Sequence, residues 1–239
     1  MLPYPHNNIF YLMTVHERYK KSIEYFQKNN PAADTELDYN NPFELIVAVI
    51  LSAQCTDKRV NIIMPALMEK FPDSASMGKA KPEEIFEYIK SCTYPNNKAK
   101  HLSGMSKLLT EEFGGTVPSD PAVLQQLPGV GRKTANVVAS VLYKKPVMAV
   151  DTHVFRVGNR IGLTVAKNTL SSEKQLVRHI PEDLINKAHH WLILHGRYIC
   201  KSRNPLCNNC GLSDFCKYYE KNSRLKVNKI KSKNFKDKS

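Results

Sequence analysis

Apolar residues recur at helical spacing through most of the chain, and no stretch of useful length alternates as a β-strand would. Residues 45–51 are apolar on all sides, which predicts a helix that is buried all round. In the segment 182–199, apolar residues fall every third or fourth position and predict one packed helical face. The pattern therefore indicates an all-α protein.

Local start and stop signals set the bounds of the predicted helices. Asn41, Pro42 and Glu44 have the arrangement of a capping box at a helix start. Asp57 is expected to cap the helix that follows, and a glycine pair at 114–115 ends a later one. The predicted helices are 16–29, 45–51, 57–71, 82–91, 99–113, 122–127, 134–143, 152–161 and 182–199.

A glycine-rich turn at 128–131 joins two of these helices. Gly129 and Gly131 tolerate positive φ and let backbone N–H groups approach a ligand closely. Together with the N-terminus of the second helix, these groups would form a phosphate site, with Arg132 and Lys133 at its mouth. The turn is thus predicted to hold a nucleic-acid backbone without reading the bases.

The charge of the chain supports a polyanionic partner. The net charge is +13 and the isoelectric point is about 9.4. Residues 217–239 contain nine Lys and Arg and two acids, so this tail contributes about half of the excess. Two interpretations of the tail stay open, a solvated and disordered end or an arm that holds DNA without sequence preference.

Four of the six cysteines lie close together in the sequence, at the spacing C-x6-C-x2-C-x5-C. They are Cys200, Cys207, Cys210 and Cys216. In a cytoplasmic chain such a group favours metal binding over disulfides. Spacing alone leaves both a zinc ion and an iron–sulfur cubane open. The other two, Cys55 and Cys92, are expected to be buried free thiols.

The segment LPGVGRKTAN at 127–136, followed by VDTH at 150–153, resembles the motif of the endonuclease III family of DNA glycosylases. The resemblance spans about residues 14–217. It implies that Lys133 is the catalytic nucleophile, that Asp151 is its essential partner, and that the four clustered cysteines hold a [4Fe-4S] cluster.

The same resemblance implies two helical lobes with the active-site cleft between them. One lobe is continuous, at about 35–145, and contains the helix-hairpin-helix motif at about 121–143. The other combines 13–34 with 146–216 and contains the iron–sulfur loop. The tail after 216 lies outside both lobes.

Further site residues follow from the resemblance alone. The stretch LSAQCTD at 51–57 matches a family segment, so Gln54 is expected to fill the space that a flipped nucleotide leaves. Asp57 and His153 would lie near the lesion pocket. Tyr94 stands where the family places an apolar wedge, and an aromatic ring can stack between bases. Pro95 departs from the family pattern at this turn and bears on the choice of opposite base.

The two catalytic assignments each have a simpler alternative. A nucleophilic lysine must react as a free amine, and both the helix N-terminus and burial in a cleft disfavour the charged form of Lys133. Lys133 could instead be one more phosphate clamp. Asp151 precedes a helix and could act as an N-cap, a role compatible with electrostatic and proton-shuttling work in the cleft.

The sequence also bears on where in the cell the protein acts. No apolar run approaches the ~20 residues that span a membrane. Residues 1–13 lack the basic start and apolar core of a signal peptide, so a cytoplasmic protein is expected, associated with the nucleoid if bacterial. Because the resemblance begins near Met13, translation is expected to start there.

The leading interpretation is a monomeric bifunctional DNA glycosylase and AP lyase that acts on double-stranded DNA containing an oxidised pyrimidine or an abasic site. An adenine glycosylase of the same superfamily is a second interpretation, although that branch lacks the lysine and usually carries a further C-terminal domain. A non-catalytic DNA-binding module is a third, and it gives no reason for Lys133, Asp151 and the four cysteines to occur together.

Overall fold

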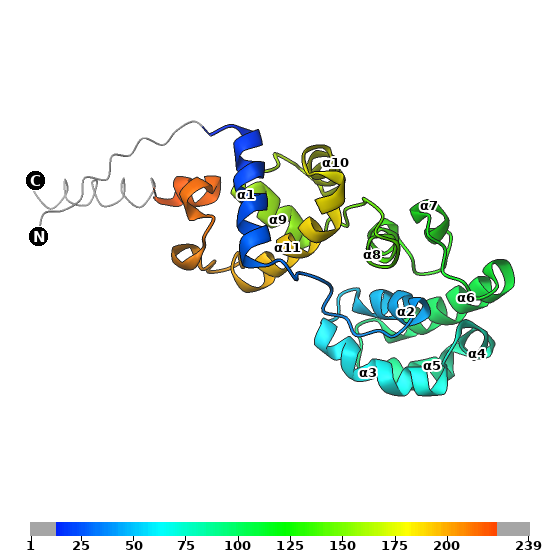
Figure 1. Ribbon diagram of the computed structural model, residues 1–239. Coiled ribbons are helices and arrows are strands. Elements are labelled where there is room, and N and C mark those ends of the chain that lie inside the picture. Colours follow the sequence, from blue (N-terminus) through cyan, green and yellow to red (C-terminus); the bar gives the residue numbers. More distant parts are fainter. Residues whose placement is uncertain (1–12, 224–239) are drawn as a thin grey trace, which may run out of the picture. The chain divides into compact units, whose positions relative to one another are not determined.

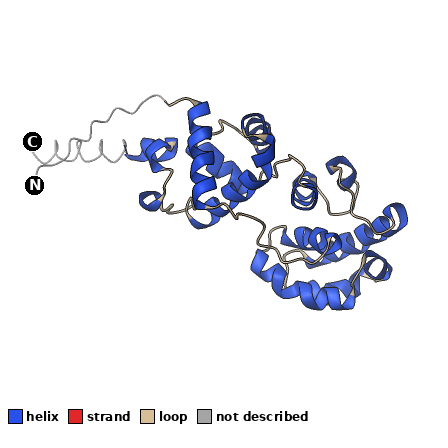
Figure 2. Ribbon diagram, in the orientation of Figure 1, coloured by secondary structure: helices blue, strands red, loops and turns tan. Residues whose placement is uncertain are grey.

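A computed structural model describes residues 13–223 of the chain (Figure 1). All regular structure in these residues is helical, and Figure 2 shows no strand in the part that is described. The chain forms two compact units. The first unit contains the described parts of Met1–Ala33, Val150–Pro181 and Trp191–Ser239, and the middle unit contains Asp34–Ala149 and Glu182–His190.

The middle unit is organised around the apolar helix α2. Its helices are α2 (Pro42–Ser52), α3 (Asp57–Lys70), α4 (Ser74–Lys79), α5 (Pro82–Ile89), α6 (Pro95–Phe113), α7 (Pro121–Leu124) and α8 (Arg132–Tyr143). Helix α2 packs against α3, α6 and α8, while α6 packs along α4 and α5. Every side chain from Leu45 to Leu51 is at most 5% exposed, which confirms the prediction of a helix buried on all sides.

The first unit contains α1 (Val15–Asn29), α9 (Thr152–Ile161), α10 (Thr169–His179) and the end of α11 (Ile185–Tyr198). Aromatic contacts join these helices. Phe26 of α1 stacks on Trp191 of α11 with ring centroids 5.8 Å apart, and Trp191 Nε1 donates to the Asn30 carbonyl at 2.8 Å. Tyr19 stacks on His179 of α10 at 5.0 Å, so α1 contacts both α10 and α11.

Several predicted bounds differ from the structure. Thr56, and not Asp57, caps α3, because its hydroxyl accepts a hydrogen bond from the Arg59 N–H. Helix α6 begins at Pro95, four residues early, since Tyr94 before it takes up a left-handed turn. The segment 182–199 is a 3-10 turn, Glu182–Leu184, followed by α11. Helices α4 and α10 were not anticipated.

Two expected segment assignments also change. Residues 182–190 group with the middle unit, because Asn186 Nδ2 donates to the Ser140 hydroxyl at 2.7 Å. Residues 217–223 are helical, so this part of the tail is not the disordered end that was one of its two interpretations, and Tyr218 lies under the Arg160 guanidinium at 4.4 Å. Residues 1–12, which precede the expected start at Met13, and 224–239, which make up most of the basic tail, lie outside the described residues.

Candidate functional site

The glycine turn between α7 and α8 has one buried side and one exposed side. Leu124, Leu127 and Val130 point into the core of the middle unit and are at most 5% exposed. The residues of the exposed side are the four that the sequence singled out, Gly129, Gly131, Arg132 and Lys133. The apolar side chains thus fix the hairpin on the core and leave its polar edge to solvent.

Only glycine fits at Gly129. Its φ is +79°, and a Cβ there would lie 2.8 Å from the Cβ of His101 on α6. Gly131 differs, because it is the N-cap of α8 with φ −83° and a Cβ would meet nothing within 4 Å. Since glycine has no side chain to cap the helix, the start of α8 is open to an external anion.

Lys133 is the second residue of α8 and lies in its first turn. The side chain is exposed, as its predicted place at the mouth of the hairpin requires. Helix α8 itself is firmly held, since buried Asn136 donates from Nδ2 to the Met148 carbonyl at 3.1 Å. The first turn therefore projects from a fixed helix.

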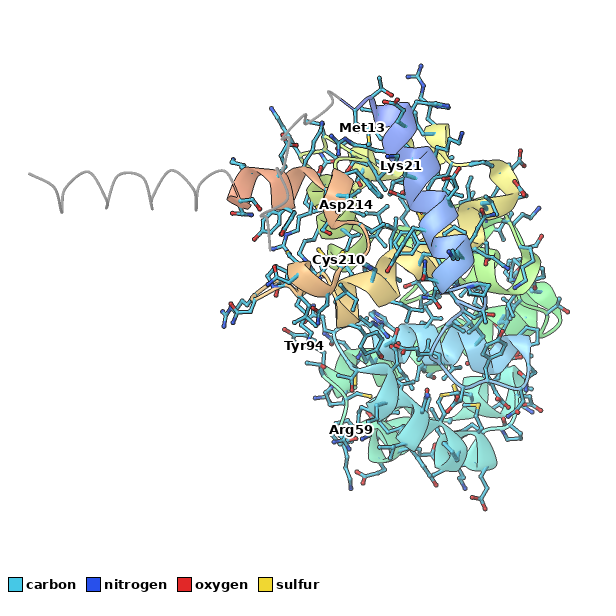
Figure 3. All side chains as sticks on the ribbon, turned by 60° about the vertical axis from the view of Figure 1, so that its left-hand side comes forward. Met13, Lys21, Arg59, Tyr94, Cys210 and Asp214 are labelled. Carbon is cyan, nitrogen blue, oxygen red and sulfur yellow. The ribbon has the colours of Figure 1, made fainter. Side chains whose placement is uncertain are left out.

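Two further residues of the middle unit occupy strained turns. Gln54, after α2, and Tyr94, before α6, have φ values of +56° and +54°. Both side chains are exposed, and Tyr94, labelled in Figure 3, is 61% exposed. Left-handed backbone at residues with a side chain costs about 1–3 kcal/mol and persists where the surroundings impose it. Asp57, the first residue of α3, is half-buried beside the Gln54 turn.

Lys98 and Thr93, which the sequence argument did not single out, hold these two turns together. The Lys98 ammonium donates to backbone carbonyls at the end of α2, and the Thr93 hydroxyl donates to the Gln54 carbonyl. Cys92 is buried nearby and Cys55 is half-buried, with their sulfur atoms 3.9 Å apart. Burial raises the pKa of the Cys92 thiol to about 11.

Asp151 belongs to the first unit and caps α9. Its Oδ1 accepts hydrogen bonds from the N–H groups of His153 and Val154, each at 2.8 Å. The N-cap role that the sequence suggested is therefore confirmed. His153 is half-buried in the first turn of the same helix, with Nδ1 3.2 Å from Arg156 Nη2.

Two arginines on α9 bind the end of α11 and the loop that follows it. Arg156 donates to the Gly196 carbonyl at 2.8 Å and to the Cys200 carbonyl at 3.1 Å. Arg160, one turn on, donates to the carbonyls of Lys201 and Ser202 at 2.6 and 3.0 Å. Cations at the end of a helix satisfy its last carbonyls. These two arginines, four residues apart after VDTH, were not identified from the sequence, although their helical spacing could have indicated a shared face.

The four clustered cysteines line one pocket in the first unit, together with apolar residues such as Ile161, Leu206 and Leu212. Figure 3 labels Cys210 in this loop. Cys210 Sγ lies 3.5 Å from Nε2 of His195, whose pKa burial lowers to about 4. Burial, followed by the neighbouring thiols, raises the pKa of Cys210 to about 11.

Four thiols around one pocket are a donor set that suits an iron–sulfur cluster. Among residues 13–223, no group of three or more His, Cys, Asp or Glu side chains is placed to hold a metal ion as the side chains stand. Gly211 allows the loop to lie against α1, because a Cβ there would be 2.3 Å from the Tyr25 ring. The four thiols that line the pocket are thus chemically suited to such a group.

Comparison with known proteins identifies the family. Residues 47–182 match the HhH-GPD superfamily base excision DNA repair protein. Endonuclease III of Rickettsia felis is 48% identical over 199 residues, which cover 83% of this chain and 93% of that protein. Endonuclease III of Escherichia coli K12 is 44% identical over 195 residues, which cover 82% and 92%. The chain belongs to the endonuclease III family.

Solved structures of the family agree with the fold described above. A trapped endonuclease III–DNA covalent intermediate matches with a TM-score of 0.84 and 39% identity, over 88% of this chain and 100% of the other. A non-covalent endonuclease III–DNA complex matches with the same TM-score, 0.84. Membership makes this chain a DNA glycosylase and AP lyase of base excision repair. Within residues 13–223, no helix has the length and apolar character that crossing a membrane requires.

Proposed function

We propose that this protein removes oxidised pyrimidines from double-stranded DNA and then cuts the abasic strand, with Lys133 as the nucleophile. The observation that carries the proposal is the position of Lys133. It lies exposed in the first turn of α8, directly after the glycine hairpin. The structural neighbour described as a trapped covalent intermediate supports a nucleophile on the protein.

The reaction has two stages, removal of the base and cleavage of the strand. The target nucleotide leaves the base stack, and the neutral amine of Lys133 attacks C1′ of its sugar. The bond from C1′ to the base breaks, and the base leaves with the bonding electron pair and takes up a proton. The attacking nitrogen then loses its extra proton, the C1′–O4′ bond breaks, O4′ takes up a proton, and an open-chain Schiff base remains. Loss of a proton from C2′ then drives cleavage of the C3′–O bond, and water releases the lysine.

Asp151 serves this reaction through its carboxylate. Its Oδ1 is fixed by the two N–H groups at the start of α9, so the orientation of the group is set before substrate binds. We assign it stabilisation of the cationic sugar and transfer of protons. His153 and Asp57 are assigned to the surroundings of the lesion.

The DNA contacts divide into backbone binding and base-stack insertion. Gly129, Gly131 and Arg132 hold phosphate at the exposed edge of the hairpin. Gln54 and Tyr94 enter the space beside the flipped nucleotide, where an amide can hydrogen-bond and a ring can stack. DNA binding should consequently weaken as salt rises.

Cys200, Cys207, Cys210 and Cys216 would hold a [4Fe-4S] cluster, which supplies cross-linking of a loop too short to form a core of its own. About four irons and four sulfides per chain are expected in protein purified without oxygen. Stoichiometric zinc without iron would refute the assignment. Cys207→Ala should give poorly soluble protein, because ligation and folding are coupled at a structural site.

The nucleophile is tested with a matched pair of variants on α8. Lys133→Gln removes the proposed nucleophile, and Lys144→Gln removes the same charge at the exposed opposite end of the helix. Lys133→Gln should bind abasic DNA but form no adduct with borohydride, whereas Lys144→Gln should form it at the wild-type rate. A Lys133→Gln protein that still forms the adduct at that rate would place the nucleophile elsewhere.

A further inference from the structure

In the middle unit, the exposed side chains of Gln54 and Tyr94 project from two turns. Hydrogen bonds from Lys98 and Thr93 link these turns. Lys98 is 5% exposed, and its ammonium donates to the carbonyls of Leu51 at 2.7 Å and Ala53 at 2.8 Å. The Thr93 hydroxyl donates to the Gln54 carbonyl at 2.5 Å. The turn after α2 is therefore fixed from the segment that begins α6, which lies about forty residues further along the chain.

Lys98 acts on both turns at once. Its side chain binds the Ala53 carbonyl, directly before Gln54, and its backbone N–H makes the helical bond to the Tyr94 carbonyl at 3.1 Å that begins α6, a bond that any residue here would make. Gln54 and Tyr94 both have left-handed backbone, which side-chained residues rarely adopt. Such conformations persist only where the surroundings over-determine them. At Gln54 those surroundings are the side-chain bonds of Lys98 and Thr93, which tie this turn to the segment that contains Tyr94.

A lysine is a demanding choice for this task. A helix usually ends with a glycine or with solvent at its last carbonyls. Here α2 ends at Ser52, and a buried ammonium binds the Leu51 and Ala53 carbonyls instead. Burial lowers the pKa of Lys98, which means that desolvation disfavours the charged ammonium that makes these two hydrogen bonds. We infer that a buried ammonium is kept here, despite its desolvation cost, because it makes the two turns rigid.

We propose that Lys98 is a positioning residue that, with Thr93, holds Gln54 and Tyr94 as one rigid pair for insertion into the base stack. This inference rests on the proposed function, in which a nucleotide leaves the duplex. A pair already ordered in free protein loses little conformational freedom on binding. Without the bonds of the Lys98 ammonium and the Thr93 hydroxyl, the Gln54 turn loses its link to the segment that contains Tyr94. The pair is then no longer rigid, and the duplex must order it on binding.

The central variant is Lys98→Met, which keeps the length and the apolar stem but removes the donor. Lys98→Arg restores a cation, and Lys100→Met is the matched control, because Lys100 is exposed on the same helix. Two substrates separate the steps. One has the lesion paired in a duplex, and the other has the same lesion in an unpaired bubble, where it is already unstacked.

Lys98→Met should release the base from the duplex at least tenfold more slowly in single turnovers, and less than threefold more slowly from the bubble. A 2-aminopurine placed beside the lesion should show less unstacking with this variant. Lys98→Arg should recover part of the duplex rate, and Lys100→Met should match wild type on both substrates. Equal loss on duplex and bubble, with active wild type, would overturn the positioning role.

Thr93→Val provides a second route that does not depend on a buried charge. Thr93 is exposed, so its replacement should fold even if Lys98→Met does not. Thr93→Val should also slow base release from the duplex more than from the bubble. An unchanged rate on the duplex would refute the proposal that Thr93 and Lys98 hold the pair rigid. If wild type neither releases a base nor forms a borohydride adduct on any substrate, the proposed function fails, which is a separate outcome.

Discussion

Replacement of Gly129 by alanine provides the most direct test of the hairpin geometry. The left-handed conformation at φ +79° costs an alanine about 1–2 kcal/mol. The new Cβ would also lie 2.8 Å from His101 Cβ, and overpacking of this kind costs about 1–3 kcal/mol. His101 cannot rotate away, because its Cβ is fixed to the backbone of α6. Alanine recovers about 0.4–1 kcal/mol by restricting the unfolded chain.

The expected net loss of stability is therefore about 1–5 kcal/mol. At about 2–4 °C per kcal/mol for a chain of this size, the melting temperature should fall by several degrees. Thermal unfolding followed by circular dichroism at 222 nm measures this shift. If the hairpin distorts locally instead, the melting temperature falls less and the affinity for abasic DNA falls with it.

Gly131→Ala is the matched control, because the same methyl group meets nothing within 4 Å at φ −83°. Its melting temperature should stay within about 2 °C of wild type, since the poorer cap and the stiffer unfolded chain offset each other. DNA affinity should fall about tenfold or more, because the methyl group blocks charge-assisted bonds from N–H to phosphate. Equal melting temperatures for Gly129→Ala and wild type would refute the argument on the turn.

Two further predictions concern other parts of the chain. Asp151→Ala should destabilise the protein by about 1–2 kcal/mol in thermal melts, because it removes both bonds to the N–H groups of His153 and Val154, whereas Asp151→Asn should stay within about 0.5 kcal/mol. A wild-type melting temperature for Asp151→Ala would contradict the cap. Cys92, with its pKa raised to about 11, should react with iodoacetamide about a hundredfold more slowly at pH 8 in native than in unfolded protein, and faster as pH rises towards 11, as peptide mass spectrometry would measure. Native labelling at the unfolded rate would contradict its burial.

The sequence predicted best those features that depend on residues close together in the chain. A cap acts within three positions, so Asn41 and Asp151 could be read directly, and both accept hydrogen bonds from the N–H groups of the helices that they precede. The burial of α2 followed from an uninterrupted apolar run. The hairpin could be read because its two glycines and its apolar residues are contiguous.

Helices α4 and α10 were missed because their buried faces are partly polar. Ser74 and Ser172 are buried, at 5% and at 0% exposure, in helices that bury only one larger apolar residue each, Met77 and Leu176. A small hydroxyl residue can be buried wherever a neighbouring helix packs closely. Periodicity of apolar residues contains no information on that neighbour, so these helices read as polar connections.

The two lysines of the middle unit show where prediction from sequence ends. Lys133, which the hairpin motif places at the mouth of a phosphate site, is exposed, while Lys98, in a polar run that resembles a solvated helix face, is buried. A lysine is buried only where acceptors reach its ammonium, and the acceptors of Lys98 lie 47 and 45 residues earlier in the chain. Those acceptors are backbone carbonyls, which every residue has, so no residue type marks them. Because the partner is the end of a helix and not a side chain, only the packing of α6 on α2 reveals that this lysine has a task.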